Sequence, residues 1–139
     1  QGSGRIINIS SVHGVTASPY KSAYITAKHG VNGFTKASAL DLAPYNITVN
    51  SICPGYVKTP LVEQQIAAQA IKNGIKEEDV IDQIMLKNHS IKDFVEIEEI
   101  ASLALYLRSP GARKMTGSIM TVDAGWTAGT PIVATGKAD

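Results

Sequence analysis

A tyrosine and a lysine stand four residues apart in the stretch SAYITAKHG, as Tyr24 and Lys28. Residues at this spacing are neighbours on one face of a helix, so the phenol and the ammonium should lie side by side. A nearby ammonium stabilises a phenolate, which suits a tyrosine to give or take a proton. Ser11, thirteen residues upstream, could donate a hydrogen bond to a substrate oxygen whose charge changes. Together these side chains suit the interconversion of an alcohol and a carbonyl, with a hydride carried by another group.

Two further polar residues lie close to this trio in the sequence. His13 follows Ser11 by two residues and should point to the same side of an extended chain, and Lys21 precedes Tyr24 by nearly one helical turn. A cation and an imidazole around an alcohol-oxidising centre suit a small hydroxy acid. Plainer roles stay open, because Lys21 could be a solvated surface lysine and His13 could bond a loop carbonyl. A Tyr-x-x-x-Lys pair is also a weak signal when taken alone.

Alternating strands and helices must position these residues. The alternation of strands and helices along the sequence predicts a parallel sheet with helices on its faces. The first strand should be buried on both faces. Ligands bind beyond the carboxyl ends of such strands, where the stretches SSVHG, PGYVKTP and DAGW lie. In the long helix, small residues are prominent at helical spacing and would let another helix approach closely; the residues at this spacing are Ala23, Ala27, Val31, Phe34 and Ser38. We expect strands over 5–10, 47–53 and 118–125, and helices over about 22–42, 61–71, 77–88 and 96–107.

Composition excludes several classes of function. The 139 residues carry a formal net charge of +1 without a basic run, which argues against a nucleic-acid partner. No apolar run is long enough to cross a bilayer, and no signal peptide is evident, so we expect a cytoplasmic protein without a membrane partner. The single cysteine, Cys53, excludes an internal disulfide and a multi-cysteine metal site, and it reads as a buried, inert thiol.

The motifs NISS, YITAK, NSICPG with VKTP, and TGSIMTVDAG follow one another along the chain. In this order they resemble the short-chain dehydrogenase/reductase family over residues 1–126. The resemblance implies a Rossmann-like doubly wound parallel sheet of the α/β class. It also implies that Ser11 orients the substrate carbonyl, that Tyr24 is the general acid/base, and that Lys28 assists Tyr24 and bonds the nicotinamide ribose. NAD would lie along Pro54, Gly55, Val57 and Thr59, although Thr59 could also serve as a helix N-cap before Pro60.

Longer stretches around these motifs are similar to the D-3-hydroxybutyrate dehydrogenases within the family. This resemblance implies an NAD-dependent interconversion of D-3-hydroxybutyrate and acetoacetate. The substrate would be bound by Ser11, His13, Lys21, Tyr24, Gln65 and Trp126. Gln64 could replace Gln65, and Trp126 could merely pack the C-terminus. His29 and His89 read as surface or packing residues. The alternatives are another small hydroxy acid as substrate, or a non-catalytic truncated fragment that acts only in assembly.

Two expected features of the family are not in the sequence. These are the glycine-rich loop that holds the pyrophosphate and the residue that selects NAD or NADP. We therefore expect residues 1–126 to be the C-terminal catalytic half of the domain, followed by an irregular tail over 127–139. The resemblance also implies a homo-oligomer built through the helix that holds Tyr24. Ala124 stands where the family commonly has glycine, and we expect this difference to be harmless.

Overall fold

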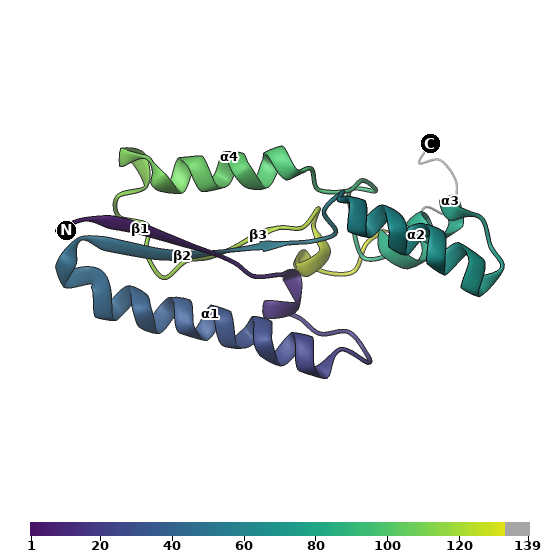
Figure 1. The fold of residues 1–139 in the computed structure, drawn as a ribbon, viewed down its shortest axis with the longest axis horizontal. Coiled ribbons are helices and arrows are strands. Elements are labelled where there is room, and N and C mark those ends of the chain that lie inside the picture. The colour runs from purple at the N-terminus through teal and green to yellow at the C-terminus, as the bar shows by residue number, and fades with distance from the viewer. Residues whose placement is uncertain (133–139) are drawn as a thin grey trace.

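The computed structural model describes residues 1–132, which form a three-stranded parallel sheet between two layers of helix (Figure 1). The strand order is β1-β2-β3, with Gly4 opposite Ile47 and Ser51 opposite Ile119. Helix α1 covers one face of the sheet and helix α4 covers the other. The expected α/β architecture is thus confirmed. The strands are β1 (Gly4–Ile9), β2 (Ile47–Pro54) and β3 (Ile119–Val122), and the covering helices are α1 (Ser22–Leu42) and α4 (Ile97–Arg108).

Strand β2 lies at the centre of the sheet and strand β1 lies at its edge. Val49 and Ile52 of β2 are fully buried because they have a neighbouring strand or helix on every side. In β1, by contrast, the side chains of Ile6 and Ile9 are 40% and 52% exposed. The expectation that the first strand is buried on both faces is therefore wrong, because only β2 pairs with it in the described chain.

Helix α1 packs on the sheet through polar side chains. Asn32, Thr35 and Ala39 are its buried residues, and Asn8 of β1 donates a hydrogen bond to the Thr35 hydroxyl over 3.0 Å. The residues that recur at helical spacing do not face the sheet, because Phe34 among them is 63% exposed. Buried polar side chains that find hydrogen-bond partners lie on the sheet-facing side instead. Of the other residues at this spacing, Ala23 and Ala27 are also exposed, and Val31 and Ser38 are half-buried.

The opposite face of the sheet holds an apolar core under α4. Ile52 of β2 packs there with Leu107 of α4 and Ala112. Helix α4 starts with a capping box, in which Glu96 and Glu99 each accept a hydrogen bond from the backbone of the other. The predicted helix over 96–107 therefore has both a defined start and a buried side.

Two shorter helices extend beyond the carboxyl end of the sheet (Figure 1). They pack on each other through Ile66, Val80 and Met85, which form a second apolar cluster. Thr59 caps the first of them, and its hydroxyl accepts a bond from the Val62 N–H over 3.3 Å. The expected helix over 77–88 is shorter than predicted and continues as a π-helical turn. The elements are α2 (Pro60–Asn73), α3 (Glu77–Val80) and the turn Ile81–Met85.

The segment that follows β3 returns to the carboxyl edge of the sheet, where Trp126 contacts His13 and Tyr56. A 3₁₀ turn, Trp126–Ala128, begins where the irregular tail was expected. Residues 133–139 of that expected tail lie outside the described residues. Among the helices of the described chain, none combines the length and the apolar character needed to cross a membrane.

Candidate active site

A cleft of about 570 Å³ opens at the carboxyl ends of β1 and β2. Its walls come from the loop after β1, the start of α1, the segment after β2 and the first turns of α2. The sequence predicted that functional residues would meet at this edge, and the structure brings most of them together. The predicted site residues that line the cleft are Ser11, His13, Lys21, Tyr24, Pro54, Gly55, Val57, Thr59 and Gln65.

Ser11 and His13 enter the cleft from a tight turn after β1. The turn, Val12–Gly14, is capped by Ser11, whose Oγ accepts a hydrogen bond from the His13 N–H over 3.1 Å. The His13 ring is buried, and its Nε2 lies 2.9 Å from the Ser18 hydroxyl rather than against a carbonyl. Burial, and secondly the charge of Lys21, lower the pKa of His13 below its usual value of 6.5. Both effects disfavour the charged form of the His13 ring.

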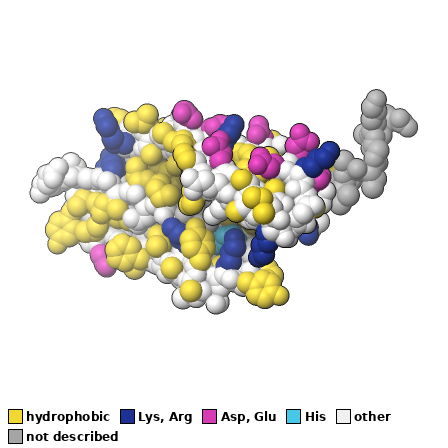
Figure 2. Space-filling view, turned by 45° about the vertical axis from the view of Figure 1, so that its right-hand side comes forward, with side chains coloured by type: hydrophobic (Ala, Val, Ile, Leu, Met, Phe, Trp, Pro, Cys, Tyr) yellow, Lys and Arg dark blue, Asp and Glu magenta, His cyan; other side chains and the backbone are white. Residues whose placement is uncertain are grey.

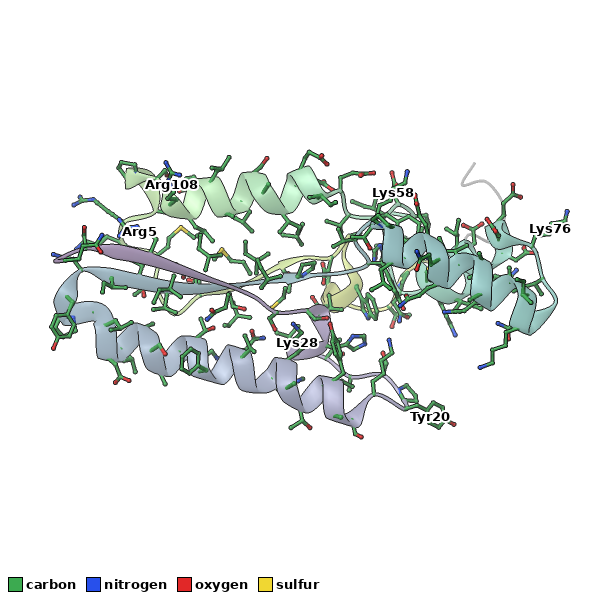
Figure 3. The ribbon with its side chains drawn as sticks, viewed as in Figure 1. Arg5, Tyr20, Lys28, Lys58, Lys76 and Arg108 are labelled. Atoms are coloured by element: carbon green, nitrogen blue, oxygen red, sulfur yellow. The ribbon has the colours of Figure 1, made fainter. Side chains whose placement is uncertain are left out.

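Tyr24 and Lys28 lie one helical turn apart on α1. The Lys28 ammonium is 5.7 Å from the centroid of the Tyr24 ring and donates a hydrogen bond to the Ile9 carbonyl over 3.3 Å. Figure 3 shows Lys28 where α1 passes the end of β1. Lys28 thus stands behind Tyr24 rather than in the wall of the cleft, whereas the Tyr24 ring is half exposed there. This arrangement agrees with the predicted helical pairing.

Trp126 adjoins the cleft through aromatic contacts. Its ring centroid is 5.5 Å from that of His13 in an edge-on arrangement, and 5.8 Å from that of Tyr56 in a stacked one. His13 in turn meets the Tyr24 ring edge-on at 5.9 Å. Trp126 therefore does pack, as the plainer interpretation held, but it packs against residues of the cleft. Tyr56 was not singled out from the sequence, although it lies within PGYVKTP, and burial raises its pKa.

Helix α2 presents one of its two adjacent glutamines to the cleft. Gln65 lines the cleft, whereas its neighbour Gln64 does not. Thr59 serves as the N-cap of α2, as expected, and it also lines the cleft. The start of α2 therefore determines where the Thr59 and Gln65 side chains lie.

A buried asparagine supports the cleft from below. Asn32 donates a hydrogen bond to the Gly14 carbonyl over 3.0 Å and accepts one from the Ser51 hydroxyl over 2.8 Å. It thereby ties the turn that carries His13 to the central strand. Cys53 is buried beside Asn32, as expected for an inert thiol. No spacing rule in the sequence marks Asn32, because its partners are far away along the chain.

Charge is unevenly spread over the molecule. Figure 2 shows a histidine among lysine or arginine side chains on one part of the surface, while most aspartate and glutamate side chains gather along another edge. Lys21 brings a positive charge to the cleft, and none of the residues lining the cleft is acidic. The cleft therefore suits an anionic ligand of small size.

Comparisons with known proteins agree with this arrangement. The family model described as "Enoyl-(Acyl carrier protein) reductase" matches residues 1–127. The D-beta-hydroxybutyrate dehydrogenase of Rhizobium meliloti is 57% identical over 128 residues, which are 92% of this chain and 50% of that protein. The D-beta-hydroxybutyrate dehydrogenase of Cupriavidus necator is 47% identical over 125 residues, which are 90% of this chain and 48% of that protein. The chain thus spans about half the length of these relatives.

Solved structures share the fold. A short-chain dehydrogenase family protein from Francisella tularensis superposes with a TM-score of 0.85 at 34% identity, over 90% of this chain and 51% of that one. A mutant 4-hydroxyisoleucine dehydrogenase complexed with NADH and succinate superposes with a TM-score of 0.78 at 37% identity, over 92% and 49% of the two chains. Together with the geometry of Ser11, Tyr24 and Lys28, these matches show that the chain belongs to the short-chain dehydrogenase/reductase family of oxidoreductases.

Proposed function

We propose that this chain carries the catalytic centre of an NAD-dependent D-3-hydroxybutyrate dehydrogenase. One observation carries the proposal: Lys21, His13 and Gln65 line the same cleft as Tyr24, the tyrosine that the family resemblance makes the general acid/base. A cation, an imidazole and an amide suit the carboxylate of a small hydroxy acid. The identity to two D-beta-hydroxybutyrate dehydrogenases supports this choice over other hydroxy acids.

The segment after β2 suits the nicotinamide end of the cofactor. Pro54 and Gly55 line the cleft and present little side chain, so a planar ring could approach their backbone. Val57 and Thr59 continue the same wall, and the family resemblance assigns the Lys28 ammonium to a ribose hydroxyl. Bound NAD⁺ would supply the acceptor for a hydride from the substrate carbon. NAD rather than NADP rests on the hydroxybutyrate dehydrogenase resemblance alone, because the solved structures with this fold include complexes with NADH and with NADPH.

The side chains of this chain would transfer the proton and stabilise the charge that develops during the reaction. Tyr24 takes the proton of the substrate hydroxyl while the hydride leaves from the same carbon, so that the alcohol becomes a ketone. The Lys28 ammonium brings a positive charge to 5.7 Å from the centroid of the Tyr24 ring, and Ser11 donates a hydrogen bond to the reacting oxygen. Lys21, His13 and Gln65 hold the carboxylate, with Trp126 packed against His13 at the rim. In the reverse direction Tyr24 returns its proton to the carbonyl oxygen of acetoacetate.

We also propose that the complete protein is a homo-oligomer that pairs through the outer face of α1. Ala23, Ala27 and Phe34 lie on that face and are exposed in the described chain. Small residues beside one large apolar ring allow two helices to approach closely. Light scattering would test this, because Phe34→Glu should lower the molecular mass in solution if the face is an interface.

The function is tested by following NADH formation from NAD⁺ and D-3-hydroxybutyrate by absorbance. The chain is assayed alone and together with the amino-terminal half of the Rhizobium meliloti relative, each time beside the Tyr24→Phe variant. Turnover that is lost with Tyr24→Phe and absent with the L-enantiomer supports the proposal. Turnover of other hydroxy acids but not of D-3-hydroxybutyrate would remove the substrate assignment. No cofactor binding and no turnover in either setting would favour the non-catalytic fragment.

A further inference from the structure

The imidazole of His89 is a buried polar group that the proposed reaction does not use. The side chain is 0% exposed, although the sequence offered only a surface or packing role for it. Its Nδ1 lies 2.9 Å from the Asp93 carbonyl, and its Nε2 lies 3.3 Å from the backbone nitrogen of Tyr56. A carbonyl can only accept and an N–H can only donate, so both bonds require a neutral ring with its proton on Nδ1.

The bond at Nε2 holds the strap, which we define as residues Pro54–Val57, the last residue of β2 and the three that follow it, all of which line the cleft. His89 bonds the strap at the Tyr56 N–H and also contacts it at Gly55, where an added Cβ would lie 2.8 Å from Nε2. Elsewhere the Gly55 N–H bonds the Val122 carbonyl of β3, and the Tyr56 carbonyl accepts from the Val95 N–H. His89 therefore occupies the side of the strap that faces away from the cleft.

The same ring supports the aromatic residues at the rim. The His89 centroid is 5.8 Å from that of Trp126 and 6.3 Å from that of Tyr56. Trp126 and Tyr56 are stacked on each other, and Trp126 also meets His13. A shift of the His89 ring would therefore reach both the backbone of the strap and the wall beside His13.

We propose that His89 is a positioning residue, whose two hydrogen bonds fix the strap and Trp126 in the shape that cofactor and substrate acid require. The inference rests on the proposed function, because it assigns the strap to the cofactor and Trp126 to the substrate side. It differs from a packing role in what it predicts. A packing role needs only the volume of the ring, whereas a positioning role needs one donor and one acceptor at the ring nitrogens.

The experiment uses the fluorescence of Trp126, which is the only tryptophan in the sequence. His89→Gln keeps an amide donor and an amide acceptor, whereas His89→Leu keeps volume but neither bond. Leu107→Ala, in the core under α4, serves as a control that lowers stability without touching the cleft. Acrylamide quenching and the emission maximum of Trp126 are measured for each variant well below its melting temperature.

A positioning role predicts that His89→Leu raises the quenching constant of Trp126 about twofold or more, while His89→Gln stays near the parent value. Leu107→Ala should leave quenching unchanged despite its lower melting temperature. The proposal is overturned if His89→Leu matches the parent protein, or if His89→Gln is quenched as strongly as His89→Leu. If His89→Leu does not fold, His89→Asn replaces it, because the shorter amide cannot span both partners. No turnover is needed, so failure here is separate from failure of the substrate assignment.

Discussion

The backbone N–H of His13 donates a hydrogen bond to the hydroxyl oxygen of Ser11 over 3.1 Å. Because the Ser11 oxygen accepts this bond, its own proton can still be donated to a substrate oxygen in the cleft. The bond also caps the turn that brings the His13 ring into the same cleft. Orientation of the substrate oxygen and placement of a carboxylate partner are therefore coupled in one short turn.

Lys21 should bind the substrate carboxylate rather than act as a solvated surface lysine. We expect Lys21→Gln to raise KM for D-3-hydroxybutyrate by about 10- to 100-fold with kcat little changed, because a charge-assisted hydrogen bond is lost in substrate and transition state alike. Lys36→Gln, on an exposed part of α1 outside the cleft, is the matched control. Equal effects of the two substitutions on KM would mean that Lys21 is a solvated surface lysine.

Gln65 and Gln64 form a natural pair for testing the amide contact. Both lie in α2, but only Gln65 lines the cleft. We expect Gln65→Ala to raise KM by about tenfold, as for one lost hydrogen bond to a charged group, and Gln64→Ala to leave KM unchanged. Steady-state kinetics of the two variants checks this. A larger effect from Gln64→Ala would mean that the wrong glutamine has been assigned.

His13 should make stability depend on pH. Burial first, and Lys21 second, lower the pKa of His13 in the folded chain below 6.5, so the unfolded chain binds the proton more readily. The contribution of His13 to the free energy of unfolding should therefore be fully present above pH 6.5. It should be lost as the pH falls from 6.5 through the lower pKa of the folded chain. Urea unfolding at several pH values should show a smaller fall for His13→Gln. His29→Gln, at an exposed position, should keep the parent slope.

Gly14 and Gly30 should respond oppositely to alanine. A Cβ at Gly14 would lie 2.5 Å from Asn32 Nδ2 and 2.6 Å from Ser10 Oγ, whereas a Cβ at Gly30 meets nothing within 4 Å. We expect Gly14→Ala to lower the free energy of unfolding by about 1–3 kcal/mol through overpacking. Gly30→Ala, in the middle of α1, should raise it by about 0.5–1 kcal/mol. Denaturant titrations that give both changes the same sign would contradict the packing described around Asn32.

Ala124 adopts a left-handed backbone with φ of 52°, in the turn after β3. Its carbonyl accepts hydrogen bonds from the Ser90 and Ile91 N–H groups, so the turn is tied to the segment next to His89. We expect Ala124→Gly to raise the free energy of unfolding by about 1 kcal/mol, because alanine is strained in this region. The expectation that alanine is harmless here would then need revision. Ala101→Gly, exposed in α4, should lower stability by a similar amount.

Periodicity and strand ends predicted the elements and the cleft well. The stretches after β1 and β2 were expected to meet, and the lining of the cleft shows that they do. This works because parallel strands must bring their carboxyl ends to one edge whatever the details of packing. The pairing of Tyr24 with Lys28 likewise follows from helix geometry alone.

The polar interior could not be predicted in the same way. Asn32 and Thr35 face the sheet because Gly14, Ser51 and Asn8 supply their hydrogen bonds, and these partners are distant in sequence. The role offered here for His89 likewise depends on a bond to Tyr56, thirty-three residues away. The pattern of residue types along one helix does not reveal such distant partners, so the sheet-facing side of α1 could not be assigned from the sequence.

The order β1-β2-β3 also has a kinetic consequence. Both ladders are parallel, with Gly4 opposite Ile47 and Ser51 opposite Ile119, so neither can start from a hairpin. Each pairing must first close a long loop, and the central strand β2 has no partner until one of these loops has closed. We expect folding to be slow for a chain of this length, with β1 and α1 docking on β2 before β3 arrives. During that interval β2 would be the segment most prone to pair with a strand from another molecule.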